Sequence, residues 1–127
     1  MLFDRVGGEQ FFVDLVDRFY DAVEHDQVLI PLYPEGEQTE GARRRLALFL
    51  MQYFGGPETY MEERGHPRLR MRHFPYSIGE QERDHWLIHM VSAIDQTVAL
   101  LPDDVQSEAR TELVEYVVNA AEHLRNQ

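Results

Sequence analysis

The chain has 127 residues, 43% of them hydrophobic, and a formal net charge of −11 that results from 23 acidic residues against 12 arginines, with no lysine and no cysteine. One domain over residues 1–127 is expected at this length, and the apolar content excludes a disordered chain. The acidic balance excludes a broad nucleic-acid-binding surface, and the apolar runs are too short for membrane insertion. The lack of cysteine and of a secretory signal pattern predicts a cytoplasmic protein.

The first predicted helix covers about residues 9–24, where apolar residues recur at helical spacing. Tyr20 lies on the stripe that this helix is expected to bury. Pro31 and Pro34 then interrupt the pattern. We therefore expect a short helical turn that ends near Tyr33 and presents this side chain close to the core.

A loop over residues 36–41 and a second helix over about residues 39–53 are expected next. Three consecutive arginines, from Arg43 to Arg45, are expected on the outer face of this helix. Its apolar residues repeat at the spacing of one buried side. This inner stripe consists of Ala42, Leu46, Phe49, Leu50 and Tyr53.

The segment over residues 57–78 contains repeated glycine and proline breakers and little periodicity, so we expect it to be mostly irregular, with one short helix around residues 71–74. Four arginines and two histidines gather within it, between Arg64 and His73. A solvated basic loop is the simpler explanation of such clustering on its own. A haem also fits, since a histidine can ligate iron and arginines can pair with the two propionates.

Two more helices are predicted after this segment. Ser77 and Glu80 match a capping box, which predicts the start of a helix that ends before Pro102 and buries Trp86, Leu87, Met90, Val91, Ile94 and Val98. The last helix is expected to begin near Asp103 or Asp104 and to bury Val105, Leu113, Tyr116, Val117, Ala120 and Leu124. A compact helical bundle has short connections, so the long irregular segment favours a chain that wraps something.

His73 is the leading candidate for a metal ligand, because aromatic, thioether and basic groups surround it in the sequence. We expect its second ring nitrogen to donate to a carbonyl or carboxylate, which would fix the ring. His66 ranks second, since glycine and proline flank it. Tyr20, Tyr33 and Trp86 could bring three hydrogen-bond donors to one buried space, although ordinary core packing explains such residues equally well.

A non-haem metal site is the alternative reading. Glu82, His85 and His89 have the spacing found in carboxylate-bridged di-iron bundles. Such a site needs a second Glu-x-x-His on another helix, and the sequence offers only Glu63 and His66 with a glycine between them. The two helical histidines are therefore expected to be exposed beside the apolar stripe. A cofactor-free helical interaction module is the third reading.

Several stretches together resemble the group II truncated haemoglobins, the type common in actinobacteria, over nearly the whole chain. The matching stretches are Val6-Gly7-Gly8, Arg18-Phe19-Tyr20, Tyr33-Pro34-Glu35, Gln52 to Pro57, Arg64 to His73, and Glu82 to Trp86. The loop from Glu35 to Gly41 is about one residue longer than expected for the group. Phe54 stands where a tryptophan is common.

The resemblance implies an all-α truncated globin, with a two-over-two helical sandwich around haem b. His73 would be the proximal iron ligand and Arg72 would meet the acid edge of the haem. Tyr20, Tyr33 and Trp86 would surround the bound gas, with Leu46 and Phe49 lining the pocket. Ala42 would take the place where many globins carry a distal histidine.

The same resemblance implies reversible binding of O2 and other diatomic gases such as CO and NO. Hydrogen bonds from Tyr20, Tyr33 and Trp86 predict slow O2 release, which favours tight binding or redox chemistry with NO or peroxide over simple oxygen transport. Peroxide could also couple the two tyrosines. Sustained turnover as an NO dioxygenase or peroxidase would need a separate reductase, since the sequence has no flavin or nicotinamide motif. Whether the chain forms a homodimer is left open.

Overall fold

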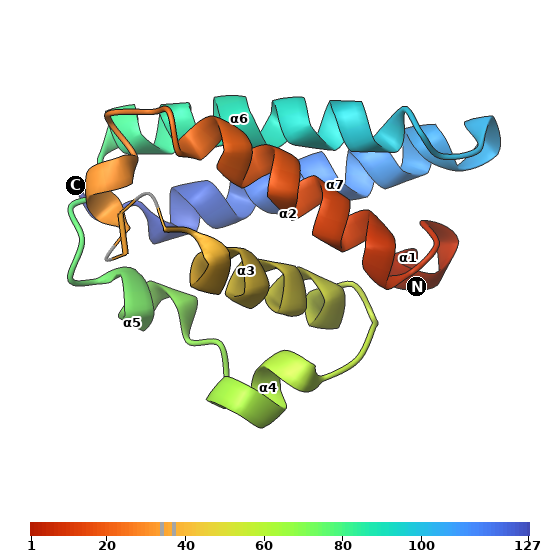
Figure 1. The fold of residues 1–127 in the computed structure, drawn as a ribbon, viewed down its shortest axis with the longest axis horizontal. Helices are drawn as coiled ribbons and strands as arrows, with labels where there is room; N and C mark the ends of the chain where they lie inside the picture. Colours follow the sequence, from red (N-terminus) through yellow and green to blue (C-terminus); the bar gives the residue numbers. More distant parts are fainter. Residues whose placement is uncertain (34, 37) are drawn as a thin grey trace.

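The protein is described here by a computed structural model of residues 1–33, 35–36 and 38–127, in which these residues form α-helices and one 3-10 helix and no strand. Four long helices make the body: α2 (Glu9–Val23), α3 (Glu40–Tyr53), α6 (Glu80–Val98) and α7 (Asp103–Leu124). Helix α2 packs on both α3 and α6, and α6 packs on α7, so that two helices lie over two (Figure 1). The predicted all-α sandwich is confirmed.

Four shorter elements complete the chain: α1 (Leu2–Arg5), the 3-10 helix η1 (Ile30–Leu32), α4 (Thr59–Arg64) and α5 (Leu69–His73). The expectation of a mostly irregular segment over residues 57–78 was wrong in part, because α4 was not predicted. The short helix expected around residues 71–74 corresponds to α5, which begins two residues earlier and ends at His73, and both short helices lie below α3 (Figure 1). Helices of one or two turns are too short to show a periodic pattern. The predicted break at Pro34, and Glu37 in the predicted loop, lie outside the described residues.

Helix α6 begins two residues later than the predicted capping box implied. Its N-cap is Gly79, whose backbone N–H donates to Oε1 of Glu82 at 2.7 Å. Ser77 instead accepts a hydrogen bond from the side chain of Gln127 at 2.6 Å. The sequence pattern thus predicted a capping box in the correct region, but the capping residues are Gly79 and Glu82 and not Ser77 and Glu80.

The hydrophobic core lies between the two layers. Its largest fully buried side chains are Phe12, Leu15, Phe19, Leu29, Leu50, Met90, Ile94 and Leu113. Burial of one such side chain stabilises the fold by roughly 1.5 to 3 kcal/mol. The prediction that Tyr53 is buried was wrong: 52% of its surface is exposed, and its ring lies against that of Tyr116, with centroids 4.0 Å apart. No helix in the described parts of the chain is long and apolar enough to cross a membrane.

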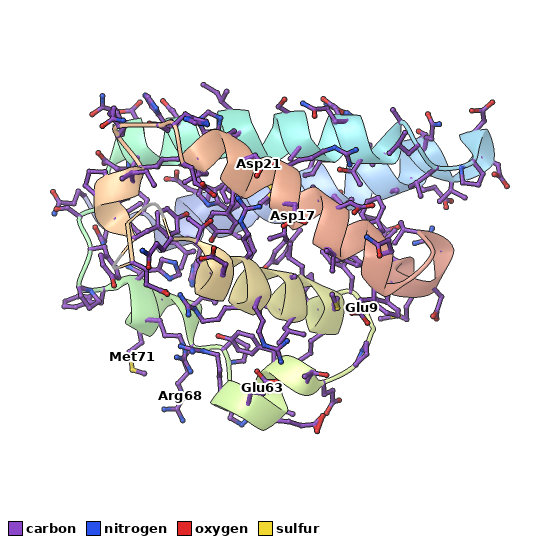
Figure 2. The ribbon with its side chains drawn as sticks, in the orientation of Figure 1. Glu9, Asp17, Asp21, Glu63, Arg68 and Met71 are labelled. Carbon is purple, nitrogen blue, oxygen red and sulfur yellow. The ribbon has the colours of Figure 1, made fainter. Side chains whose placement is uncertain are left out.

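Arg43 does not lie on an outer face, as the sequence had suggested, but between α3 and α2. Its Nη1 donates to Oδ1 of Asp17 at 3.0 Å and its Nη2 to Oδ1 of Asp21 at 2.9 Å, and Nη2 also pairs with Glu24. Asp17 and Asp21, labelled in Figure 2, lie one turn apart in α2, and Glu24 is the residue that follows its last turn. One guanidinium therefore neutralises a row of acidic groups and joins the two helices.

We expect Arg43→Met to lower the free energy of unfolding by about 1 to 3 kcal/mol, because hydrogen bonds to charged groups are lost and three carboxylates keep no counter-charge. Urea unfolding measures this change. Arg44→Met is the matched control, since that neighbouring side chain is 61% exposed and pairs with Glu63 on the surface. It should cost at most about 0.5 kcal/mol. Equal losses in the two variants would contradict the role given to Arg43.

Candidate functional site

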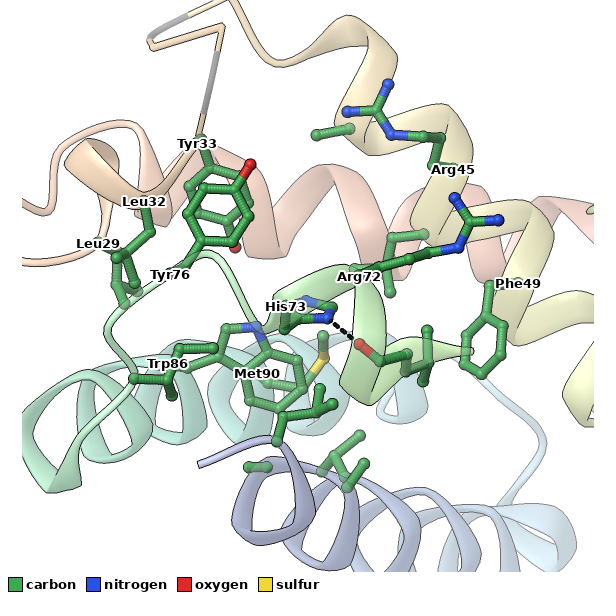
Figure 3. A pocket seen from close by; sticks show the side chains of 18 of the residues that line it. Leu29, Leu32, Tyr33, Arg45, Phe49, Arg72, His73, Tyr76, Trp86 and Met90 are labelled. Carbon is green, nitrogen blue, oxygen red and sulfur yellow. Dashed lines mark hydrogen bonds between the residues drawn. The ribbon is translucent and has the colours of Figure 1, made fainter. Parts of the chain in front are cut away.

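A cavity of about 410 Å³ opens between α3, α5, α6 and α7 (Figure 3). All eight residues that were predicted to line the pocket lie in the wall of this cavity. They are Tyr20, Tyr33, Ala42, Leu46, Phe49, Arg72, His73 and Trp86. Residues far apart in the sequence thus converge on one space. His66, the second candidate for a metal ligand, is exposed and does not belong to the wall.

His73 is the last residue of α5, and a hydrogen bond to a backbone carbonyl orients its ring. Its Nδ1 lies 2.7 Å from the oxygen of Leu69, one turn earlier in the same helix (Figure 3). A carbonyl oxygen only accepts hydrogen bonds, so Nδ1 carries the hydrogen and Nε2 of the neutral ring keeps its lone pair. This is the carbonyl partner that the sequence analysis expected. The imidazole is therefore oriented and has one nitrogen available as a metal ligand.

An aromatic cluster occupies another part of the wall. Tyr20 comes from α2, Tyr33 follows η1 and Trp86 comes from α6. The rings of the two tyrosines meet edge to face with centroids 5.5 Å apart. Phe19 packs against both Tyr20 and Trp86, at 4.9 and 5.4 Å between centroids, and so fixes their rings from the core side. Three polar aromatic groups thus share one buried region.

Burial controls the ionisation of the two tyrosines. It raises the pKa of Tyr33 to about 12, although hydrogen bonds with Tyr20 and Trp86 act in the opposite direction. Burial, followed by the neighbouring Tyr33, also raises the pKa of Tyr20 well above its ordinary value. A protonated phenol can donate a hydrogen bond and a phenolate cannot. Both side chains therefore keep their donor hydrogens over the physiological pH range.

Asp26, which the sequence analysis missed, joins the corner before Tyr33 to helix α6. Its Oδ2 accepts hydrogen bonds from Nδ1 of His85 at 2.9 Å and from Nε2 of His89 at 2.6 Å. Its Oδ1 accepts the backbone N–H of Val28 at 2.8 Å. Burial opposes ionisation of this carboxyl, but the hydrogen bonds from the two histidines and the backbone outweigh burial and lower its pKa. The expectation that the histidines are simply exposed was wrong, since both are half-buried.

The alternative metal site does not form as the spacing suggested. Glu82 caps the start of α6, whereas His85 and His89 turn to Asp26. Across residues 1–33, 35–36 and 38–127, no three His, Asp or Glu side chains are placed to hold a metal ion. The spacing of these residues shows that they share one side of a helix, but not what that side faces.

Four arginines reach the cavity: Arg45, Arg64, Arg72 and Arg83. Arg72 donates from Nε to the oxygen of Pro67 at 2.7 Å and from Nη2 to the oxygen of Arg64 at 2.9 Å, so part of its guanidinium holds the loop before α5. Arg45 was expected on the outer face of its helix but lies at the cavity. Cationic groups beside an apolar cavity suit a flat ligand with an anionic edge.

Several other wall residues were not predicted to belong to the site. They include Leu29, Leu32, Tyr60, Leu69, Met90, Tyr116 and Val117. Met90, Tyr116 and Val117 had been assigned to buried helix stripes, which is correct for their helices but does not distinguish the core from a cavity. Tyr60 and Leu69 lie on the short helices that the sequence did not predict at those positions.

Comparisons with known proteins agree with this arrangement. The model of the family described as Bacterial-like globin matches residues 1–126. Group 2 truncated hemoglobin YjbI from Bacillus subtilis (strain 168) is 39% identical over 120 residues, which cover 94% of this chain and 85% of that protein.

Solved structures give the same result. A thermostable hemoglobin from the actinobacterium Thermobifida fusca is 52% identical, with a TM-score of 0.90 and coverage of 99% of this chain and 97% of that one. A truncated oxygen-avid haemoglobin from Bacillus subtilis is 35% identical, with a TM-score of 0.84 and coverage of 98% of both chains. These matches extend over essentially the whole fold.

The raised pKa of Tyr33 leads to a test at alkaline pH. The folded state keeps the Tyr33 proton up to about pH 12, whereas an unfolded chain loses it near pH 10. The stability of the protein should therefore fall as the pH rises between these two values. NMR titration of tyrosine labelled with ¹³C at Cζ should show the Tyr33 signal shifting last or near-last, and Tyr33→Phe should remove that signal and its share of the alkaline loss. A Tyr33 signal that titrates at about 10 would contradict the assignment.

Proposed function

The chain belongs to the bacterial-like globin family, within the group II truncated haemoglobins, and from this premise we propose that it holds haem b in the described cavity and reversibly binds O2, CO and NO. One observation carries the proposal: an imidazole oriented by a carbonyl at 2.7 Å lies in the same cavity as three aromatic hydrogen-bond donors. This combines an axial ligand with a polar pocket for a small gas. A haem held there would supply an iron with one open coordination position.

His73 is the proposed axial ligand. Because the Leu69 carbonyl takes the hydrogen of Nδ1, the lone pair for the metal is on Nε2. The hydrogen bond also makes the ring a better electron donor and limits its rotation. Leu46 and Phe49 would cover the porphyrin as apolar wall residues, and Arg72, with Arg45 and Arg64, would balance its acid groups.

A non-covalently held haem b suits this chain, because the covalent attachment of a c-type haem needs cysteine and the sequence has none. The same lack of cysteine suits a reducing compartment, so the proposal includes the cytoplasm as the place of action.

The proposal also includes tight O2 binding. Tyr20, Tyr33 and Trp86 can each present a hydrogen to a polar diatomic ligand, and Ala42 leaves room beside them. Hydrogen bonds that involve a charged partner contribute about 1.5 to 3 kcal/mol each, and about 1.4 kcal/mol changes an equilibrium tenfold. The similar haemoglobin from Bacillus subtilis is described as oxygen-avid. We infer that this chain also releases O2 slowly.

We infer redox chemistry with NO or peroxide as a second activity of the same cavity. It is favoured by the adjacent rings of Tyr20 and Tyr33, which are oxidisable groups next to the cavity. Repeated turnover would require electrons from a separate protein.

The axial role of His73 is tested by His73→Ala. The variant should lose the normal Soret band and its shift with CO after reconstitution with haemin and reduction with dithionite, because His73 is the histidine that the described residues bring to the cavity wall. His66→Ala is the matched control, since that exposed histidine lies outside the wall, and it should behave like the unmodified protein.

Two results would count against the proposal. A normal CO-sensitive Soret band in His73→Ala would remove its basis. Loss of bound iron only when His85 and His89 are replaced would support the non-haem reading instead.

The role of the aromatic donors is tested by the O2 dissociation rate. Trp86→Phe, Tyr20→Phe and Tyr33→Phe each remove one donor, and at least one of them should raise the rate about tenfold or more. Tyr60→Phe is the matched control, because it removes a hydroxyl from another part of the same wall. Stopped-flow displacement of O2 by CO gives the rates. A fast rate in the unmodified protein, or no increase in any of the three variants, would rule out donor-controlled retention.

A further inference from the structure

Helix α5 has a second side that the proposed gas-binding function does not use. Arg68, Arg70, Met71 and Phe74 are exposed there, and we call them the α5 face. Met71 and Phe74 are among the most exposed large apolar residues of the protein, at 61% and 78%. Figure 2 shows Arg68 and Met71 pointing away from the body, whereas His73 lies at the cavity in Figure 3. One short helix thus presents a basic and apolar surface outward and an imidazole inward.

The charge of the α5 face is opposite to that of the whole molecule. From Arg64 to Gly79 the sequence contains four arginines and no acidic residue, although the chain has 23 acidic residues and a net charge of −11. Arg72 folds back onto backbone carbonyls, whereas Arg68 and Arg70 extend into solvent. A local basic region on an acidic protein orients an approaching acidic partner toward itself and repels it from other directions.

The position of the α5 face matters because of His73. Phe74 follows the proposed axial ligand directly in the chain, and Met71 lies two residues before it. A protein bound at this face would therefore be separated from the cavity only by the single turn of α5 that carries the ligand. The other strongly exposed apolar residues, Met1, Ile88 and Leu100, all lie more than ten residues from His73 in the sequence.

We propose that the α5 face is the docking surface for an acidic one-electron donor protein of the ferredoxin or flavodoxin class. The inference rests on the proposed haem function. One electron leaves the reduced donor, which is oxidised by one unit, and the ferric iron becomes ferrous without any bond being formed or broken. Arg68 and Arg70 attract and orient the donor, and Met71 and Phe74 form the apolar centre of the contact.

The composition of the face fits a transient protein partner. Methionine, phenylalanine and arginine are enriched at protein interfaces, where an apolar centre is surrounded by polar groups. The small extent of the α5 face agrees with the size of electron-transfer contacts, which are weak and short-lived. A membrane surface and a second copy of the chain are the other occupants that the experiment distinguishes.

Binding is measured first, because it does not depend on turnover. Calorimetry with the haem-loaded ferric protein, titrated with a plant-type ferredoxin and separately with a flavodoxin, each of negative net charge, should detect a complex with at least one of them. Its affinity should fall about tenfold or more between roughly 20 and 200 mM salt, since the screening length shortens over this range. Arg68→Gln with Arg70→Gln should weaken it about tenfold or more at low salt, and Phe74→Ser should weaken it without changing the salt dependence.

The matched control is Arg5→Gln with Arg110→Gln, which removes the same charge from surface ion pairs elsewhere on the protein. It should retain most of the affinity. Stopped-flow reduction by the donor should slow in the α5-face variants, whereas reduction by dithionite and the CO-bound spectrum should stay unchanged in all of them. Altered dithionite reduction or spectra would indicate a damaged haem pocket and so a failure of the proposed function.

Three results would overturn the docking proposal itself. The first is no salt-dependent binding to either donor, and the second is an equal loss of affinity in the control variant. The third is that the face binds something else: vesicles of phosphatidylserine in a sedimentation assay, or a second copy of the chain in analytical ultracentrifugation, with Arg68 and Arg70 required for that binding.

Discussion

The carboxylate of Asp26 is the interaction on which the arrangement of the aromatic donors depends. One of its oxygens accepts hydrogen bonds from both histidines of α6, and the other accepts backbone N–H groups of the corner that follows α2. Trp86 lies between the two histidines along the helix, and Tyr33 lies at the end of the same corner. A side chain that is only 8% exposed thus sets the distance between two elements that meet at the cavity. The hydrogen bonds keep it ionised and therefore able to accept from both sides.

The opposite wall of the cavity depends on a much shorter element. Helix α5 is a single turn, and it stays in place through the Leu69 carbonyl that holds the His73 ring and through Arg72, which bonds the loop before it. The same turn faces solvent with Arg68 and Met71 (Figure 2). The inner side of α5 is proposed to hold the cofactor, and its outer side is proposed to bind the electron donor. Because the helix is a single turn, these two sides lie close together.

Some site residues could be predicted from the sequence, and others could not. His73 was chosen because aromatic, thioether and basic residues surround it in the sequence, and the three polar aromatics because they lie on or next to apolar stripes; all four side chains line the cavity. Arg43 and Arg45 were assigned to the surface because periodicity treats every arginine as an outward residue. Pairing with Asp17, Asp21 and Glu24 nevertheless makes a half-buried position favourable for Arg43. The short helices α4 and α5 were missed or misplaced, since one or two turns leave no measurable period.

The sequence by itself determined the all-α class, the four long helices, and the histidine and aromatic residues that gather at one site. These features depend on the local spacing of apolar residues and on residue type, and both can be read directly from the sequence. Only the tertiary structure decided which partner each polar group takes. Asp26 is more than fifty residues from the histidines that it binds, and Glu82 is drawn to the backbone N–H of Gly79 and not to those histidines. Such choices depend on distances across the fold, which the spacing of residues along the chain does not record.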